Sequence, residues 1–236
     1  MGNSSDRAQL RQRRIMSYFI EAADEIIQDE GVAALTIRKV ADRAGYTSAT
    51  LYNYFDNLNH LIFLATLKHL EEYNNEIALR VAGCKNPVEI YLVISECFCE
   101  YSFRDPEIYN LLFYGSIDEK VDAYTRQYYE LFENKKDGLP TISKIIGVSN
   151  LYRRSLIMLM DCVESGFFSS ENAIDFNDIA MLIYRGILRD VLDGKLTAQS
   201  ATVKNMKYYC QLMRFYIEPE YRDLLDSGYL KAAVDQ

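Results

Sequence analysis

The chain has 236 residues and a formal net charge of −8; apolar residues make up 49% of it and charged residues 25%. These are ordinary values for a globular protein with a sizeable core, and the low content of proline (four) and glycine (eleven) disfavours a β-sandwich or barrel. No apolar run approaches the roughly 18–20 residues that span a bilayer, and the N-terminus lacks an apolar secretory segment, so we expect a cytoplasmic protein with no membrane partner.

Three helices are predicted in the first 56 residues. The apolar positions of the first recur at steps of three and four residues, namely Ile15, Phe19, Ala22 and Ile26. Gly31 ends this helix. A second helix is predicted over residues 36–44, and a third over residues 47–55 after a break at Gly45, each with a threonine as N-cap.

The remainder of the chain is also helical in pattern. Its strongest start signal is Asn86-Pro87-Val88-Glu89, with Asn at the N-cap, Pro at the first helical position and Glu at the third. The predicted helices span residues 58–82, 86–103, 105–115, 121–133, 149–168, 178–193 and 200–217. No segment alternates apolar and polar residues persuasively, so we predict no strand and an all-α fold. The predicted domains are a three-helix N-terminal domain (residues 1–56) and a larger helical domain (residues 57–236).

The negative charge is unevenly distributed. Residues 1–56 carry seven Lys/Arg and eight Asp/Glu, a net charge of −1, and the remainder carries −7. Four arginines form a basic arm at the start: Arg7, Arg11, Arg13 and Arg14. Acidic residues cluster farther along the first helix. One face of the first domain can therefore be positive although the domain is nearly neutral.

Side chains for catalysis or metal binding are scarce. The odd cysteine count and scattered spacing argue against a disulfide framework, and buried, reduced thiols are the simpler interpretation. The five are Cys84, Cys97, Cys99, Cys162 and Cys210. The sequence has two histidines and no phosphate loop, dinucleotide-binding glycine pattern or His-Glu-x-x-His. We expect a protein that is not an enzyme, with no cofactor, metal or catalytic residue.

Residues 36–55 have the spacing of a helix-turn-helix. Ala41 is small enough for two helices to cross closely, and Gly45 suits a turn with positive φ. Leu51 and Phe55, four residues apart, anchor the third helix in the core. The remaining residues of the third helix form an outer surface. The nine residues predicted for this helix would rise about 13 Å, which matches a major groove about 12 Å wide.

These residues resemble the TetR family of transcriptional regulators over about residues 15–62. The matching strings are Ala22-Ala23, Gly31-x-x-x-Leu35-Thr36, Val40-Ala41-x-x-Ala44-Gly45 and Thr50-Leu51-Tyr52-x-Tyr54-Phe55. The resemblance implies operator DNA as a partner, a homodimer, and a larger domain for ligand binding and dimerisation. It also implies a repressor that a small-molecule effector of unknown identity releases from DNA.

The resemblance further implies which residues face DNA. Those expected at base edges or adjacent phosphates are Ser48, Ala49, Thr50, Tyr52 and Asn53. Those expected at phosphates are Thr36, Arg38, Thr47, Tyr52 and Tyr54, with hydroxyls and helix-start N–H groups as donors. The basic arm is expected to follow the backbone or to enter the minor groove.

Two departures keep an alternative open. Family members usually carry a lysine where this chain has Leu58, and no Lys or Arg occurs from Ala44 to Leu67. Bidentate reading of guanine by arginine is therefore absent from the third helix. The alternative is a helical ligand-binding or protein-interaction module with weak or lost DNA binding.

Aromatic residues of the larger domain suggest a ligand pocket, although core packing explains any one of them as well. The candidate ligand residues are Tyr91, Phe98, Tyr101, Phe113, Tyr128 and Asp161. Asp161 stands in an otherwise apolar run, so it is expected either to pair with an arginine or to receive a polar or cationic ligand. With Glu96 and Glu100, it weakly favours a cation.

Apolar stripes on the last two long helices predict a homodimer through a four-helix interface. The first stripe comprises Ile179, Leu182, Ile183, Gly186 and Ile187. The second comprises Val203, Met206, Cys210, Met213 and Ile217. Packing within one chain is the alternative explanation for both.

Overall fold

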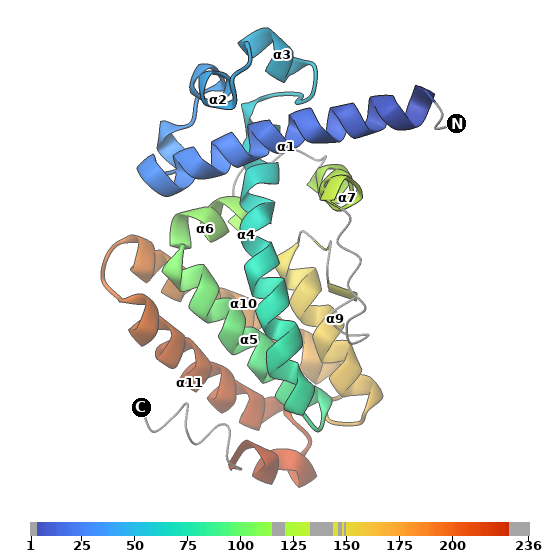
Figure 1. Ribbon diagram of the computed structural model, residues 1–236. Helices are drawn as coiled ribbons and strands as arrows, with labels where there is room; N and C mark the ends of the chain where they lie inside the picture. Colours follow the sequence, from blue (N-terminus) through green and yellow to red (C-terminus); the bar gives the residue numbers. More distant parts are fainter. Residues whose placement is uncertain (1–3, 115–120, 133–143, 146–147, 149, 227–236) are drawn as a thin grey trace. The chain divides into compact units, whose positions relative to one another are not determined.

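The computed structural model describes residues 4–114, 121–132, 144–145, 148 and 150–226 (Figure 1). Within these ranges the chain is helical with no strand, which confirms the all-α prediction. It forms two compact units, Met1–Glu71 with Leu111–Lys135, and Glu72–Asn110 with Lys136–Gln236. The expected division after residue 56 stays a prediction. None of the described helices is long and apolar enough to cross a membrane.

The first unit contains α1 (Ser4–Glu30), η1 (Val32–Ala34), α2 (Ile37–Ala44) and α3 (Ser48–Tyr52). It also contains α7 (Val121–Phe132) and the start of α4 (Leu58–Arg80). Helix α2 packs against α1 and α3. The centre of the unit is the buried ring of Phe19, which meets Phe55 edge-on with centroids 5.9 Å apart. Burying these rings fixes how α3 is presented to solvent.

The basic arm predicted at the N-terminus belongs to α1, which already begins at Ser4. Arg7, Arg11 and Arg14 follow one another at steps of four and three residues and are exposed, so they form a stripe along one side of this helix. A helix is about 10–12 Å across with its side chains, whereas the minor groove is about 6 Å wide. A stripe on a helix suits phosphates of the DNA backbone better than the narrow minor groove, and the DNA contacts of the arm stay a prediction.

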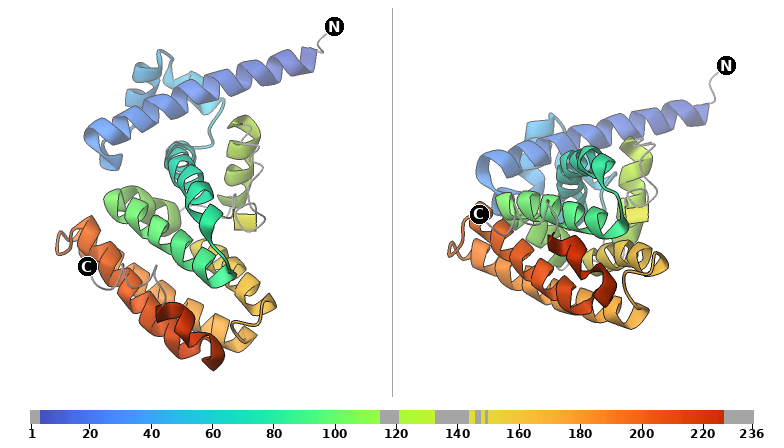
Figure 2. Two further views of the ribbon diagram at one scale, coloured as in Figure 1. Left: turned by 60° about the horizontal axis from the view of Figure 1, so that its bottom comes forward. Right: turned by 90° about the horizontal axis from the view of Figure 1, so that it is seen from below.

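The second unit contains the end of α4, η2 (Val81–Gly83), α5 (Pro87–Arg104) and the start of α6 (Pro106–Tyr114). It continues with α9 (Leu151–Glu164), α10 (Ser170–Leu192), α11 (Ala198–Tyr216) and η3 (Pro219–Asp226). Helix α5 packs against α9 and α11, and α10 packs against the same two helices. These four helices lie side by side (Figure 2). Their buried side chains include Tyr91, Phe103, Phe176, Tyr184 and Tyr209.

Helix α10 begins eight residues before the start predicted at residue 178. The Ser169 hydroxyl caps it by accepting a hydrogen bond from the Asn172 N–H at 3.1 Å. Ala173, Phe176 and Ala180 are then fully buried, at the spacing of one helix face. The polar residues 169–172 resemble a loop when read alone; the burial of the residues that follow stabilises this turn as helix.

The five cysteines are free, and all except Cys84 are buried. Burial raises the pKa of Cys97 and Cys162 to about 12, so both thiols are protonated at neutral pH. Among the described residues, no three His, Cys, Asp or Glu side chains are grouped to hold a metal ion.

Candidate nucleic-acid interface and internal cavity

Two threonines and one glycine set the local geometry of the helix-turn-helix. The Thr36 hydroxyl accepts from the Lys39 N–H at 3.2 Å, and the Thr47 hydroxyl accepts from the Thr50 N–H at 3.1 Å, so α2 and α3 are both N-capped. Gly45 ends α2 with φ of +75°, and the following Tyr46 N–H donates to the Ala41 carbonyl at 2.9 Å. This left-handed turn redirects the chain into α3.

Gly45→Ala should lower the stability of the protein by about 1–2 kcal/mol, because a Cβ disfavours the left-handed conformation. No heavy atom lies within 4 Å of a Cβ built at Gly45, so the cost is confined to the backbone. Gly83→Ala is the matched control, since its Cβ also meets nothing within 4 Å and its φ is not positive. Thermal unfolding followed by circular dichroism measures both; equal melting temperatures for the two variants would contradict the argument.

Helix α3 covers only Ser48–Tyr52, so its rise is about 7 Å rather than the predicted 13 Å. The helix tightens at its end because the Tyr54 N–H bonds to the Leu51 carbonyl, three residues back, at 3.0 Å. Tyr52 has 58% of its surface exposed, and Ala49 and Asn53 are exposed beside it.

The remaining candidate side chains around α3 are less exposed to solvent. Ser48 and Thr50 are half-buried, and the Thr50 hydroxyl shares a hydrogen bond of 2.9 Å with Thr47. Tyr54, expected to face outward, is half-buried against Phe19, with centroids 6.4 Å apart. Tyr52 is therefore the aromatic residue that α3 presents most fully to solvent.

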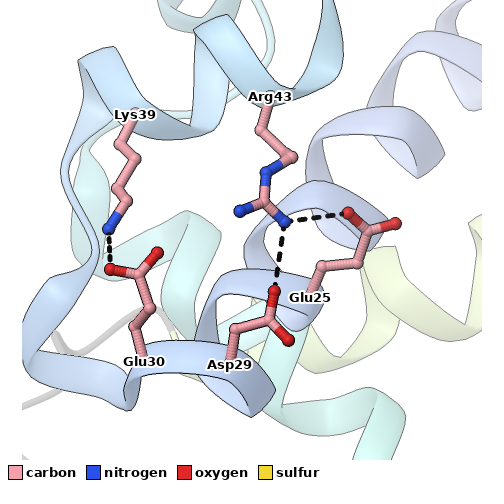
Figure 3. A network of polar contacts seen from close by, with 5 residues as sticks. All are labelled: Glu25, Asp29, Glu30, Lys39 and Arg43. Atoms are coloured by element: carbon pink, nitrogen blue, oxygen red, sulfur yellow. Dashed lines mark hydrogen bonds and ion pairs between the residues drawn. The ribbon is translucent and has the colours of Figure 1, made fainter.

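Ion pairs between α1 and α2 decide which cations of α2 are available for DNA (Figure 3). Lys39 pairs with Glu30, and Arg43 lies 3.2 Å from Glu25 and 3.4 Å from Asp29. The hydrogen bonds that Arg43 donates to these two carboxylates raise its pKa. Acidic residues of α1 therefore neutralise the charges of both cations, and these ion pairs hold α2 against α1.

Arg38 differs from these two cations. Its side chain is 91% exposed, and its contact with a carboxylate is a long one, 3.8 Å to Asp42 on the same helix. Exposed pairs of this kind contribute little free energy. Arg38 can therefore turn toward a phosphate at small cost, as its assignment as a phosphate contact requires.

His60 is a residue of this unit that the sequence did not point to. It is 3% exposed, and its ring stacks on Tyr124 of α7 at 3.8 Å between centroids. The Asp56 N–H donates to Nδ1 at 3.2 Å, which places the ring proton on Nε2, 3.1 Å from the Gln127 oxygen. The Tyr124 hydroxyl also donates to the Asp56 carboxylate at 3.0 Å.

These contacts fasten the segment after α3 to α7. The two segments are more than 60 residues apart in sequence, so no local pattern could have indicated the pairing. A buried histidine in a complete hydrogen-bond chain fixes the start of α4, and with it the frame on which α3 sits.

A cavity lies inside the second unit, bounded by α4, α5, α9, α10 and α11. It contains about 400 Å³ of space outside protein atoms, including its opening to solvent. Its lining residues are Tyr73, Tyr91, Ile94, Ser95, Phe98, Cys99, Leu151, Arg154, Ser155, Met158, Met181, Tyr184 and Tyr209. Mostly apolar walls with a few polar groups are typical of sites for small organic ligands.

The structure brings two of the six candidate ligand residues to this cavity, Tyr91 and Phe98. Tyr101 instead contacts Tyr73 edge-on and carries Arg104 over its ring at 4.6 Å. Phe113 and Tyr128 fall in the first unit. There the Tyr128 hydroxyl donates to Glu71 at 2.7 Å.

Asp161 does not line the cavity. Its side chain is 16% exposed and accepts from Lys144 at 2.6 Å. Lys144 is thus one partner of this carboxylate, in line with the expectation that it is paired. The charged residue of α9 that lines the cavity is Arg154, which sequence reasoning passed over.

An apolar face lies on the neighbouring helices α10 and α11. On α10, Leu182 is 70% exposed and Ile179 is 37% exposed, and Gly186 has open space beyond its Cα. On α11, Phe215 is 74% exposed and Tyr208 is 38% exposed. Large apolar side chains gathered on two packed helices are typical of a protein interface.

The stripe predicted on α11 is a different one. Met206, Cys210, Met213 and Ile217 are buried within the chain, as is Ile187 of α10. Their side of α11 faces α5 and α10 and forms core. The solvent-facing stripe, with Tyr208 and Phe215 exposed and Leu212 half-buried between them, is offset by two positions, and a shift of two residues moves to another face of a helix.

Comparisons with known proteins agree with this architecture. Residues 19–63 match the bacterial regulatory proteins of the tetR family. Over 70 residues the chain is 30% identical to the HTH-type transcriptional regulator HbdR of Aromatoleum sp. (strain CIB). That match covers 30% of this chain and 31% of HbdR, so it spans about a third of the relative.

Solved structures extend the likeness of fold to most of the chain. RolR in complex with resorcinol superposes with a TM-score of 0.59 at 13% identity, covering 93% of this chain and 96% of RolR. Thermus thermophilus FadR, a TetR-family transcriptional repressor in complex with lauroyl-CoA, gives a TM-score of 0.52 at 16% identity, covering 84% and 92%.

Proposed function

Since this chain belongs to the tetR family of bacterial regulatory proteins through its DNA-binding domain, we propose that it is a dimeric transcriptional regulator controlled by a small ligand. The observation that carries the proposal is the capped helix-turn-helix with Tyr52 exposed at its tip. Two such heads, one per protomer, read two half-sites about 34–36 Å apart.

In the proposed complex, α3 enters the major groove and hydroxyl-bearing residues contact phosphates and base edges. Thr36 and Thr47 stand at helix starts, where backbone N–H groups favour a phosphate. Arg38 and the α1 stripe of Arg7, Arg11 and Arg14 supply the positive charge that α3 lacks. Base recognition then rests on Tyr52, Asn53 and the small residues Ser48 and Ala49, and not on arginine.

The ligand half of the proposal rests on the cavity of the second unit. RolR was crystallised with resorcinol and FadR with lauroyl-CoA, and both share the fold. We place the effector of this chain among α5, α9 and α10, and propose that it releases a repressor from its operator. Because α4 contributes residues to both units, it is the connection along which a ligand-dependent change reaches the reading head. The release requires that the ligand bind the two states of the protein unequally.

Two observations favour a second function. Acids of α1 neutralise the charges of Lys39 and Arg43, and α3 has no basic residue. In this alternative the chain is a helical ligand-binding or interaction module whose DNA binding has become weak.

Duplex binding measured as a function of salt tests the proposal. The dimer should bind a duplex carrying the region upstream of its own reading frame, and log affinity should fall linearly with log salt. Four exposed arginines per protomer, Arg7, Arg11, Arg14 and Arg38, give at most eight phosphate contacts, so the slope should be no steeper than about −7. A scrambled duplex is the control. Equal affinity for both duplexes, or no binding at about 50 mM salt, would favour the alternative function.

A further inference from the structure

Arg154 is the buried cation of the cavity. It is 2% exposed and lies in the first turn of α9, with its side chain on the cavity wall. Its guanidinium carbon is 5.7 Å from the centre of the Tyr73 ring. Nη2 is buried and makes no hydrogen bond within the described residues. One edge of the guanidinium therefore has donors to spare.

No wall of the cavity supplies a counter-charge. The lining contains neither Asp nor Glu, and no carboxylate of the described chain lies within ion-pair distance of Arg154. Arg80 of the same unit contrasts with it, since it lies 2.8 Å from both Glu76 and Glu100. The carboxylate nearest along α9, Asp161, is held by Lys144.

Three of the four phenols that line the cavity do not supply the charge either. Burial raises the pKa of Tyr73 to about 12, although the Arg154 charge favours its anion. Burial also raises the pKa of Tyr91 and Tyr209 above the ordinary range. All three are neutral at physiological pH. An isolated buried cation is costly to a fold, and no carboxylate of the described residues offsets this one, so its position suits an anionic ligand.

We propose that the effector is a small organic acid, of about one ring, whose carboxylate pairs with Arg154. A planar guanidinium matches a carboxylate with two parallel hydrogen bonds. The apolar body of the ligand lies against Phe98, Met158 and Met181, and the Ser95 hydroxyl serves as a further polar contact. The inference rests on the proposed ligand-responsive function and replaces the cationic effector expected from Asp161.

Calorimetric titration of the full-length protein with isosteric ligands tests the charge. The probes are benzoate, benzamide and benzylamine at constant ionic strength. Benzoate should bind about 10- to 100-fold more tightly than benzamide, as a charge-assisted hydrogen bond predicts, and benzylamine more weakly than either. Arg154→Gln should abolish the preference for benzoate. Arg154→Lys should retain part of it, because the positive charge remains although the planar group that makes two parallel hydrogen bonds is lost.

Arg153→Gln is the matched control, since it removes the same charge from the preceding, exposed position of α9. It should keep the wild-type preference. Equal affinities for benzoate and benzamide, a preference that survives Arg154→Gln, or no binding by any of the three probes would each overturn the inference.

The melting temperature of the ligand-free protein tests whether Arg154 serves ligand binding or stabilises the fold. Arg154→Met removes an uncompensated buried charge and keeps the apolar stem, so it should raise the melting temperature by about 2–4 °C. A lower melting temperature would show that Arg154 stabilises the fold through Tyr73, and would overturn the inference.

Failure of the proposed function has a separate signature. If benzoate binds through Arg154 yet leaves the affinity for DNA unchanged, the anion site stands and the proposed release from the operator fails. If benzamide binds as well as benzoate and still weakens DNA binding, the regulator stands and the anion site fails.

Discussion

Tyr52→Ala is expected to weaken operator binding by the dimer on the order of 100-fold, because each protomer loses one contact to a charged phosphate worth about 1.5 kcal/mol. The residue is 58% exposed at the tip of α3 and is not part of the core, so the variant should remain folded and dimeric. Its melting temperature should match that of the wild type, as for most surface substitutions. Fluorescence anisotropy with a labelled operator duplex measures the loss.

Two further variants separate the causes. Tyr52→Phe removes only the hydroxyl, so it should reproduce most of the loss if the contact is to a phosphate and little of it if the ring packs on a base. Leu79→Ala is the control, because Leu79 is also a large exposed side chain (74%) but belongs to the second unit and not to the unit that carries α3. Operator binding by Tyr52→Ala at wild-type affinity would remove α3 from the DNA interface.

Leu182→Glu should convert a dimer of about 55 kDa into monomers of 27.3 kDa at micromolar concentration. Leu182 is 70% exposed in the middle of the apolar face on α10 and α11. Across a two-fold axis, glutamates from both protomers would enter the same apolar contact, where desolvation and mutual repulsion oppose association. Light scattering after size-exclusion chromatography measures the mass directly.

Loss of the dimer should also weaken operator binding by about 100-fold or more, since a monomer engages one half-site without the effective concentration that the second head supplies. Leu79→Glu is the matched control: Leu79 is 74% exposed on α4, away from α10 and α11. A dimeric Leu182→Glu would exclude this face from the interface. A monomeric Leu79→Glu would show instead that any exposed charge of this kind disrupts assembly.

Tyr52→Ala and Leu182→Glu are expected to lose different properties, so measuring both separates DNA contact from dimerisation. Tyr52→Ala should lose DNA binding and keep its mass, whereas Leu182→Glu should lose both. Neither touches the cavity, so both should bind benzoate as the wild type does if the anion site is correct.

Local features of the sequence were sufficient for the all-α class and for the caps and turn of the helix-turn-helix, but not for the length of α3 or the start of α10. Threonines 36 and 47 cap α2 and α3, Gly45 turns the chain between them, and the Asn86-Pro87 start gave α5 at its observed position. These signals act within one turn of helix, through a side chain and the backbone beside it. A single sequence therefore contains them in full.

Partners of charged side chains could not be obtained in the same way. Lys39, Arg43 and Arg38 share one helix, yet two are offset by acids of α1 and one is left to solvent. On α9, Asp161 looked like the buried charge, but it reaches Lys144, and Arg154, seven residues earlier, lines the cavity. Whether a charge is paired depends on which residues another segment brings within about 4 Å of it.

Faces of helices were decided by packing as well. Both apolar stripes of α11 fit a helical period, and only contact with α5 and α10 shows that Met206 and Met213 belong to the core while Phe215 faces solvent. His60 meets Tyr124 across more than 60 residues of chain in the same manner. Caps, turns and helix periodicity are local and were determined by the sequence itself. Burial and pairing arise only when distant segments share a core, so the tertiary structure decided them.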